Sequence, residues 1–107
     1  MQKQTAGRDA LGELAPEFAH LNDDVLFGEV WAREAQLSLR ERSIITVTAL
    51  ISKGIFDASL QYHLRNAKKN GVTRDEMAEI ITHLAFYVGW PNAWGAFAQV
   101  KAAYAED

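Results

Sequence analysis

His63 is the side chain whose position in the sequence best suits acid–base chemistry. On a helical wheel it lies beside Leu60, Leu64 and Ala67, on the edge of an apolar stripe where a leucine would gain more from burial. One interpretation is a structural histidine whose ring nitrogens bond to a backbone carbonyl. The other is a general acid or base whose pKa is tuned by its apolar surroundings. The sequence leaves both interpretations open.

His83 has a polar and an aromatic companion, since Glu79 lies four residues before it and Tyr87 four residues after it. This spacing is compatible with a surface pair between His83 and Glu79 and also with a contact to a substrate. We assign no function to His20. The three histidines form no HxxxH or His-x-Glu pattern, so we expect no metal site. We likewise expect no phosphate site, because no glycine-rich loop follows a strand.

The segment HLAFYVGWPNAWGAF, residues 83–97, concentrates aromatic side chains around a helix break. It predicts a tight corner between two helices, because Gly89 can end one helix and Pro91 is tolerated in the first turn of the next. The corner brings Trp90 and Trp94 to the junction, where their rings can wall a cavity or contact another copy of the chain. The plain alternative is that these rings serve only the core and an interface.

Capping residues and apolar spacing predict helices throughout, and we see no β-alternation of useful length. The capping box Thr73-Arg74-Asp75-Glu76 begins one helix, and Asp57 can cap another. The helix after Arg42 is apolar on nearly every side, so we expect it to be central and buried. The predicted helices are a weak one over residues 16–27 and stronger ones over 39–52, from Asp57 to Asn70, from Thr73 to Gly89 and over 92–104.

Composition predicts one small domain that associates with itself. The 107 residues are 49% hydrophobic, with a formal net charge of -3 and no cysteine. We expect a single domain over residues 1–107, with an aromatic surplus that a homo-oligomer would bury. Without a basic cluster we expect no nucleic-acid partner, and without a long apolar run no membrane segment and a cytoplasmic location. Without cysteine there is no disulfide or thiolate chemistry.

Three segments together resemble the gamma-carboxymuconolactone decarboxylase family. They are LSLRERSIITVTALISKG, QYHLRNAKKNGVTRDEMAEIITHLAFYVGWPNAWGAF and, upstream, LFGEVWAR. The resemblance implies an all-α, alkylhydroperoxidase-D-like fold with a helical hairpin core, assembled as a symmetric oligomer, commonly a hexamer. Thiol-dependent members of this superfamily carry a Cys-x-x-Cys pair four residues before a histidine. Here those positions are Phe56 and Ser59, so the chain is similar to the branch without that pair.

The resemblance also implies cofactor-free decarboxylation of a small carboxylated lactone, as in the catabolism of aromatic compounds. His63 would deliver a proton, Arg40 or Arg42 would pair with a substrate carboxylate, and Glu41 would set the local hydrogen bonds. The substrate would also be bound by His83 and walled by Phe86, Tyr87, Trp90 and Trp94. No metal or cofactor is implied. The alternative is a noncatalytic module of the same superfamily that binds a small molecule or serves assembly.

Overall fold

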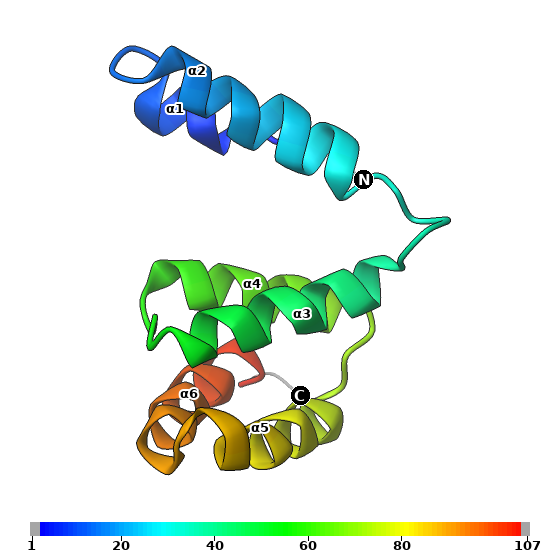
Figure 1. Cartoon of the computed structure of the whole chain (residues 1–107), viewed down its shortest axis with the longest axis vertical. Helices are drawn as coiled ribbons and strands as arrows, with labels where there is room; N and C mark the ends of the chain where they lie inside the picture. Colours follow the sequence, from blue (N-terminus) through cyan, green and yellow to red (C-terminus); the bar gives the residue numbers. More distant parts are fainter. Residues whose placement is uncertain (1–2, 106–107) are drawn as a thin grey trace. The chain divides into compact units, whose positions relative to one another are not determined.

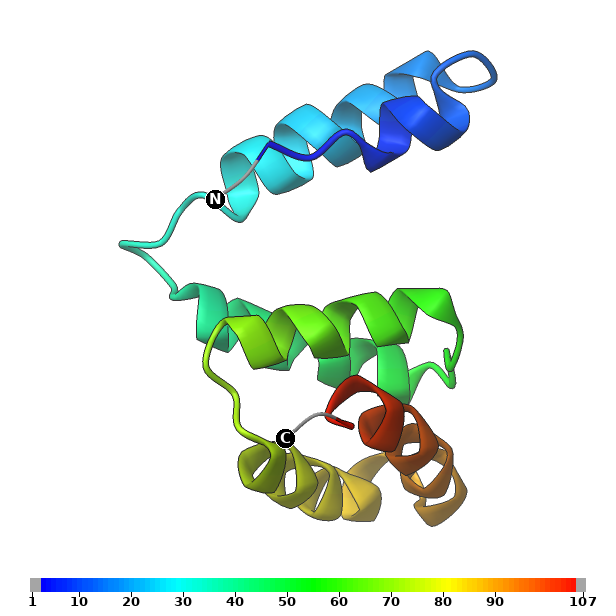
Figure 2. The same ribbon diagram turned by 180° about the vertical axis from the view of Figure 1, so that it is seen from behind.

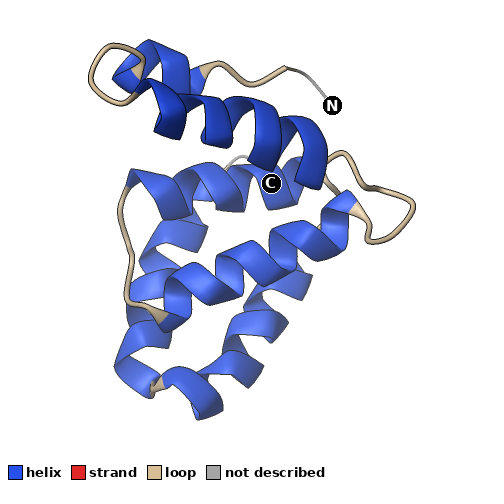
Figure 3. Ribbon diagram, turned by 45° about the horizontal axis from the view of Figure 1, so that its top comes forward, coloured by secondary structure: helices blue, strands red, loops and turns tan. Residues whose placement is uncertain are grey.

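The computed structural model describes residues 3–105, and the regular secondary structure in that part of the chain is helical (Figure 3). The predicted all-α fold is therefore confirmed. The chain divides into two compact units, an N-terminal unit, Met1–Leu39, and a C-terminal unit, Arg40–Asp107 (Figure 1). The single domain predicted over residues 1–107 stays a prediction, and its ends, residues 1–2 and 106–107, lie outside the described residues.

The N-terminal unit packs two short helices and a π-helix together. α1 spans Ala6–Leu11, and α2, Pro16–His20, continues directly into the π-helix η1, Leu21–Val30. Pro16 lies in the first turn of α2, where its missing N–H removes no helical hydrogen bond. The sequence predicted a helix over 16–27, but neither α1 nor the wider winding of η1.

A buried carboxylate joins α1 to η1. Asp23 is 2% exposed, and its oxygens accept the backbone N–H groups of Gly7 at 2.8 Å and Arg8 at 2.9 Å. Those N–H groups belong to the first turn of α1, where no helical carbonyl can accept them. Burial raises the pKa of Asp23, but hydrogen bonds from Asn22, Arg8 and Gly7 outweigh it and leave the pKa below its ordinary value.

One stripe of η1 and its flanks is buried at a spacing of four residues. Its members are Ala19, Asp23, Phe27 and Trp31. The rings of Phe27 and Trp31 stack with centroids 6.0 Å apart. The backbone N–H of Trp31 donates to the carbonyl of Leu26, five residues earlier, which is the π-helical bond.

The C-terminal unit contains four helices (Figures 1 and 2). α3 and α4 run in opposite directions, and α5 and α6 meet at a corner. Their bounds are Leu39–Ser52 for α3, Ala58–Lys69 for α4, Arg74–Val88 for α5 and Trp90–Ala103 for α6. These bounds confirm the predicted helices to within two residues at each end.

The predicted start and stop signals of these helices are also confirmed. The Asp57 side chain accepts the N–H of Ser59 at 2.9 Å at the start of α4. Thr73 and Glu76 form a reciprocal capping box at the start of α5. Gly89 then has a φ of 107° between α5 and α6, a backbone conformation that favours glycine.

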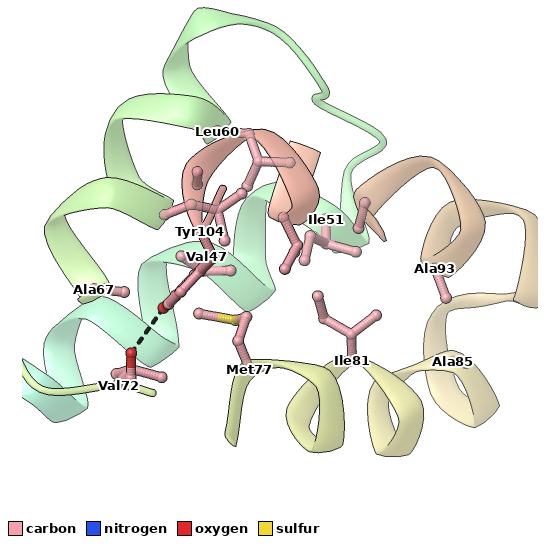
Figure 4. Close-up of a cluster of buried hydrophobic side chains, with 14 residues drawn as sticks. Val47, Ile51, Leu60, Ala67, Val72, Met77, Ile81, Ala85, Ala93 and Tyr104 are labelled. Carbon is pink, nitrogen blue, oxygen red and sulfur yellow. Dashed lines mark hydrogen bonds between the residues drawn. The ribbon is translucent and has the colours of Figure 1, made fainter. Parts of the chain in front are cut away.

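The core of the C-terminal unit lies between α3, α4, α5 and α6 (Figure 4). Residues from all four helices contribute, and the Tyr104 hydroxyl donates to the Val72 carbonyl at 2.8 Å within the same cluster. We predicted that α3 is central and buried. That prediction is wrong for the single chain, because α3 buries one stripe, with Val47 and Ile51 fully covered, while Ile45 on another side is 56% exposed.

Candidate active site

His63 lies in α4, half-buried, with its Nδ1 atom fully buried. Its ring meets the ring of Tyr62 edge-on, with centroids 4.9 Å apart. Burial lowers the pKa of His63, because the surrounding protein disfavours the charged imidazolium. Burial thus favours the neutral imidazole, which is the state that can accept a proton.

Two hydrogen bonds show which side of α4 carries His63. On one side, the Gln61 amide donates to the Gln99 side chain of α6 at 2.8 Å. On the other side, the Asn70 amide donates to the Ser43 hydroxyl of α3 at 2.9 Å. His63 precedes Asn70 by seven residues, which is about two helical turns, so it shares the side that faces α3. The buried stripe of α4 lies between these two sides.

The two arginines at the start of α3 point to different sides, because residues two apart lie about 200° apart around a helix. The Arg40 guanidinium forms an ion pair with Glu76 and donates to the Gly71 carbonyl at 3.4 Å. It thus links α3 to the loop and capping box that begin α5. Arg42 is half-buried on another side of α3, and Glu41 between them is exposed.

The four predicted wall residues form an exposed aromatic corner where α5 meets α6. We call Phe86, Tyr87, Trp90 and Trp94 the aromatic corner; they are 78%, 77%, 57% and 71% exposed. Phe86 and Trp90 meet edge-on with centroids 6.0 Å apart. A groove of about 300 Å³ runs along it, lined by Thr82, Ala85, Trp90, Ala93, Trp94 and Phe97. A groove of this size and lining suits a small apolar or aromatic group.

His83 is exposed on α5 and lies in a different groove. Its ring centroid is 5.2 Å from that of Tyr87. The groove, about 470 Å³, lies between α3 and α5 and is also lined by Ile44, Thr48, Glu79, Ile80 and Leu84. The expected proximity of His83 to Glu79 and Tyr87 thus appears as a shared groove and a ring contact.

Within one chain, the predicted site residues are distributed over three surfaces. His63 is on the side of α4 that faces α3, His83 lies between α3 and α5, and Trp90 and Trp94 lie along α5 and α6. The groove along the aromatic corner is lined by no charged side chain. Sequence reasoning missed the lining residues Thr82 and Phe97, although Phe97 follows Trp94 at the three-residue spacing of one helix face.

Two kinds of feature are absent from the described residues. Residues 3–105 contain no group of three or more His, Cys, Asp or Glu side chains arranged to hold a metal ion. No helix in the same range is long and apolar enough to cross a lipid bilayer.

The chain is similar to known proteins along most of its length. The profile of the Carboxymuconolactone decarboxylase family matches residues 16–102. A 4-carboxymuconolactone decarboxylase of Acinetobacter baylyi is 33% identical over 94 residues, covering 88% of this chain and 69% of that protein. The nitrosuccinic acid decarboxylase npaB of Metarhizium robertsii is 36% identical over 66 residues, covering 62% of this chain and 45% of that protein. An uncharacterized 15.0 kDa protein of Paracoccus denitrificans is 27% identical over 99 residues, covering 92% of this chain and 73% of that protein.

Proposed function

The chain belongs to the carboxymuconolactone decarboxylase family, and from this premise we propose that it is a carboxy-lyase that removes CO2 from a small carboxylated lactone without a cofactor. The observation that carries the proposal is the position of His63, a half-buried imidazole on the side of α4 that faces α3. A histidine held in such surroundings is suited to proton transfer.

The chemistry of the two named relatives supports a reaction without a cofactor. In a gamma-carboxylated butenolide, the electrons released with CO2 pass through the ring double bond into the lactone carbonyl. In nitrosuccinic acid, named for the Metarhizium relative, a nitro group can accept the corresponding electrons. Both substrates thus carry their own electron sink. We propose that the substrate of this chain shares that property.

Each polar residue then has a distinct role. The C–C bond to the carboxylate breaks, CO2 leaves, and His63 as an imidazolium delivers a proton to the ring carbon that received the electrons. Arg42 pairs with a substrate carboxylate, and Glu41 orients Arg42 by local hydrogen bonding. Bound carboxylates also favour the imidazolium, which offsets the lowering of its pKa by burial. His63 regains its proton from water for the next cycle.

Arg40 and His83 receive supporting roles in this proposal. Arg40 is engaged with Glu76 and Gly71, so it positions the start of α3 and contributes positive charge to the site from a distance. His83 lies beside Tyr87 and contacts a polar group at the edge of the substrate. The aromatic corner supplies the apolar walls that keep water from the departing carboxylate. We further propose a cytoplasmic protein that assembles as a hexamer.

A noncatalytic binding module is the second candidate, and the separation of His63 from the aromatic corner within one chain favours it. One assay distinguishes the two. The purified protein is incubated with a gamma-carboxylated butenolide and with nitrosuccinic acid, and CO2 release and loss of ring absorbance are recorded without added cofactor. CO2 release by the wild type, lost in His63→Leu and reduced less in the comparison variant His83→Leu, supports the lyase. Quenching of tryptophan fluorescence by these acids with no CO2 release supports the module and rejects the lyase.

A further inference from the structure

We propose that the active site is shared between two copies of the chain: the aromatic corner of one copy docks on α4 of a second copy and walls the site that contains His63. The catalytic part of this inference rests on the proposed decarboxylase function. The docking part rests on the surface of the chain alone.

The first observation is the separation of the required groups. Decarboxylation needs an acid, a cation and dry walls around one small molecule. His63 faces α3, and the groove along Trp90 and Trp94 is lined by no charged side chain. A second copy that brings its aromatic corner to the first copy's α4 would unite these groups.

The second observation is the area that the aromatic corner exposes. A large aromatic side chain has about 150–250 Å² of surface, so four rings exposed by 57% to 78% present roughly 500 Å² in one place. A stable interface buries about 800 Å² on each partner. The corner therefore supplies more than half of one side of such an interface, and neighbouring residues of α5 and α6 supply the remainder.

The third observation is charge, which selects α4 as the docking surface. α4 carries Arg65, Lys68 and Lys69 and no acidic residue between Ala58 and Lys69. α5, which carries half of the aromatic corner, has the exposed acidic residues Asp75 and Glu79. Two α5 helices facing each other would bring acidic residues together, whereas α5 against α4 pairs opposite charges.

α4 also offers an apolar contact beside the imidazole. Tyr62 is 44% exposed and its ring touches that of His63, so a partner's rings that pack on Tyr62 would reach the edge of the site. Because the two contacting surfaces differ, the contact is heterologous, and repeating it with a closing rotation builds a ring of copies. Every junction of that ring would contain one site.

A disulfide experiment tests the docking directly, because the chain contains no cysteine of its own. Tagged Tyr62→Cys and untagged Phe86→Cys chains are co-expressed, oxidised mildly and separated by mass. We expect a mixed disulfide of one tagged and one untagged chain, and no disulfide when Phe86→Cys is expressed alone. The matched control replaces Tyr62→Cys by Lys101→Cys, at an exposed position on α6. Efficient self-linking of Phe86→Cys, or equal yield with the control, overturns the proposal.

A second measurement separates the shared site from the reaction. Trp94→Ala removes an exposed ring, so the chain should still fold. Dissociation of the oligomer in this variant supports docking. An oligomer that keeps both its size and full turnover contradicts docking. If Trp94→Ala retains the oligomer but not turnover, it is co-expressed with His63→Leu. If the site is shared, these mixed oligomers should recover about a quarter of wild-type turnover. Random assembly places an intact aromatic corner against an intact His63 at about one junction in four. No recovery places the site within one chain.

A mixed disulfide in a protein whose wild type releases no CO2 upholds the docking and rejects the decarboxylase function.

Discussion

The ring of Phe56 lies against Gly95, so closely that a Cβ on Gly95 would stand 2.9 Å from the Phe56 Cε2 atom. Phe56 is fixed by a further contact, because its carbonyl accepts the Gln99 amide at 2.9 Å. The resemblance to thiol-dependent relatives assigns the first cysteine to position 56. In this chain that position holds a ring that packs against α6 and the core.

Gly95→Ala should destabilise the protein although alanine is the better helix former. Crowding in a packed core costs about 1–3 kcal/mol, against a helix gain of about 0.5–1 kcal/mol, so we expect a net loss of about 1 kcal/mol in the free energy of unfolding. The sign should reverse in a Phe56→Ala background, where the ring is gone. Urea denaturation of the four chains of this double-mutant cycle measures it. The same destabilisation in both backgrounds would contradict the Phe56 contact.

His63→Leu should reduce turnover about a hundredfold or more, the usual contribution of one general acid or base, without unfolding the protein. A leucine at this half-buried position should keep the thermal midpoint or raise it, because it gains burial energy. His83→Leu should change turnover less. Loss of folding or of the oligomer in His63→Leu, seen by circular dichroism and light scattering, would instead mean that the imidazole is a structural hydrogen-bonding group.

The stability of the protein should fall as pH decreases through the range in which His63 titrates. Burial lowers the pKa of His63 in the folded chain, so the unfolded chain binds this proton more readily. The contribution is fully present above about pH 6.5, the ordinary value for histidine, and is lost as pH falls towards the lowered pKa. Thermal midpoints between pH 5 and 8 should show this slope in the wild type. The slope should be smaller in His63→Leu. An unchanged slope would mean that other groups cause the pH dependence of the thermal midpoint.

Substitutions of the two arginines at the start of α3 should have different effects. Arg40→Met removes the contacts to Glu76 and Gly71, so the thermal midpoint should fall by about 2–4 °C with little change in KM. Arg42→Met should raise KM about tenfold or more, because it removes the charge that binds the substrate carboxylate. A KM that rises in Arg40→Met and not in Arg42→Met would exchange the roles proposed for the two arginines.

Lowering the pH should weaken the contact between α1 and the π-helix η1. The pKa of Asp23 and that of Asp24 are both lowered in the folded chain, so the stability they contribute is present above about pH 4 and is lost as pH falls below it. The amide NMR signals of Gly7 and Arg8, whose N–H groups donate to Asp23, should shift in this range before the core signals change. Asp23→Asn should show shifted signals already at pH 7, and unchanged signals would contradict the anchoring role.

The helices of the C-terminal unit could be predicted because their boundaries are set locally. Asp57, the Thr73–Glu76 capping box and the positive φ of Gly89 each act within a few residues, and all three were visible in the sequence. The identity of the aromatic corner could be predicted for the same reason. The spacing that places Trp90 and Trp94 at a helix junction is also local.

Features that depend on distant residues could not be predicted. The engagement of Arg40 with Glu76 joins positions 36 apart in the chain, so the sequence offered Arg40 and Arg42 as equivalent candidates. The burial of only one stripe of α3 likewise depends on which sides the other helices cover, and apolar composition does not reveal that. α1 lacked a signal because it has no side-chain cap and owes its start to Asp23, 16 residues after Gly7.

The π-helix makes the N-terminal unit sensitive to the length of its sequence more than to its composition. Four residues span about 400° in an α-helix, so each step from Ala19 to Asp23, Phe27 and Trp31 would rotate the next side chain about 40° further off line. Over three steps the drift would reach about a third of a turn. The wider winding between Leu21 and Val30 cancels this phase error. A chain one residue shorter in that segment would place Asp23 and Trp31 seven residues apart, about two α-helical turns, so the segment would have to rewind as an ordinary α-helix to keep the two side chains on one side.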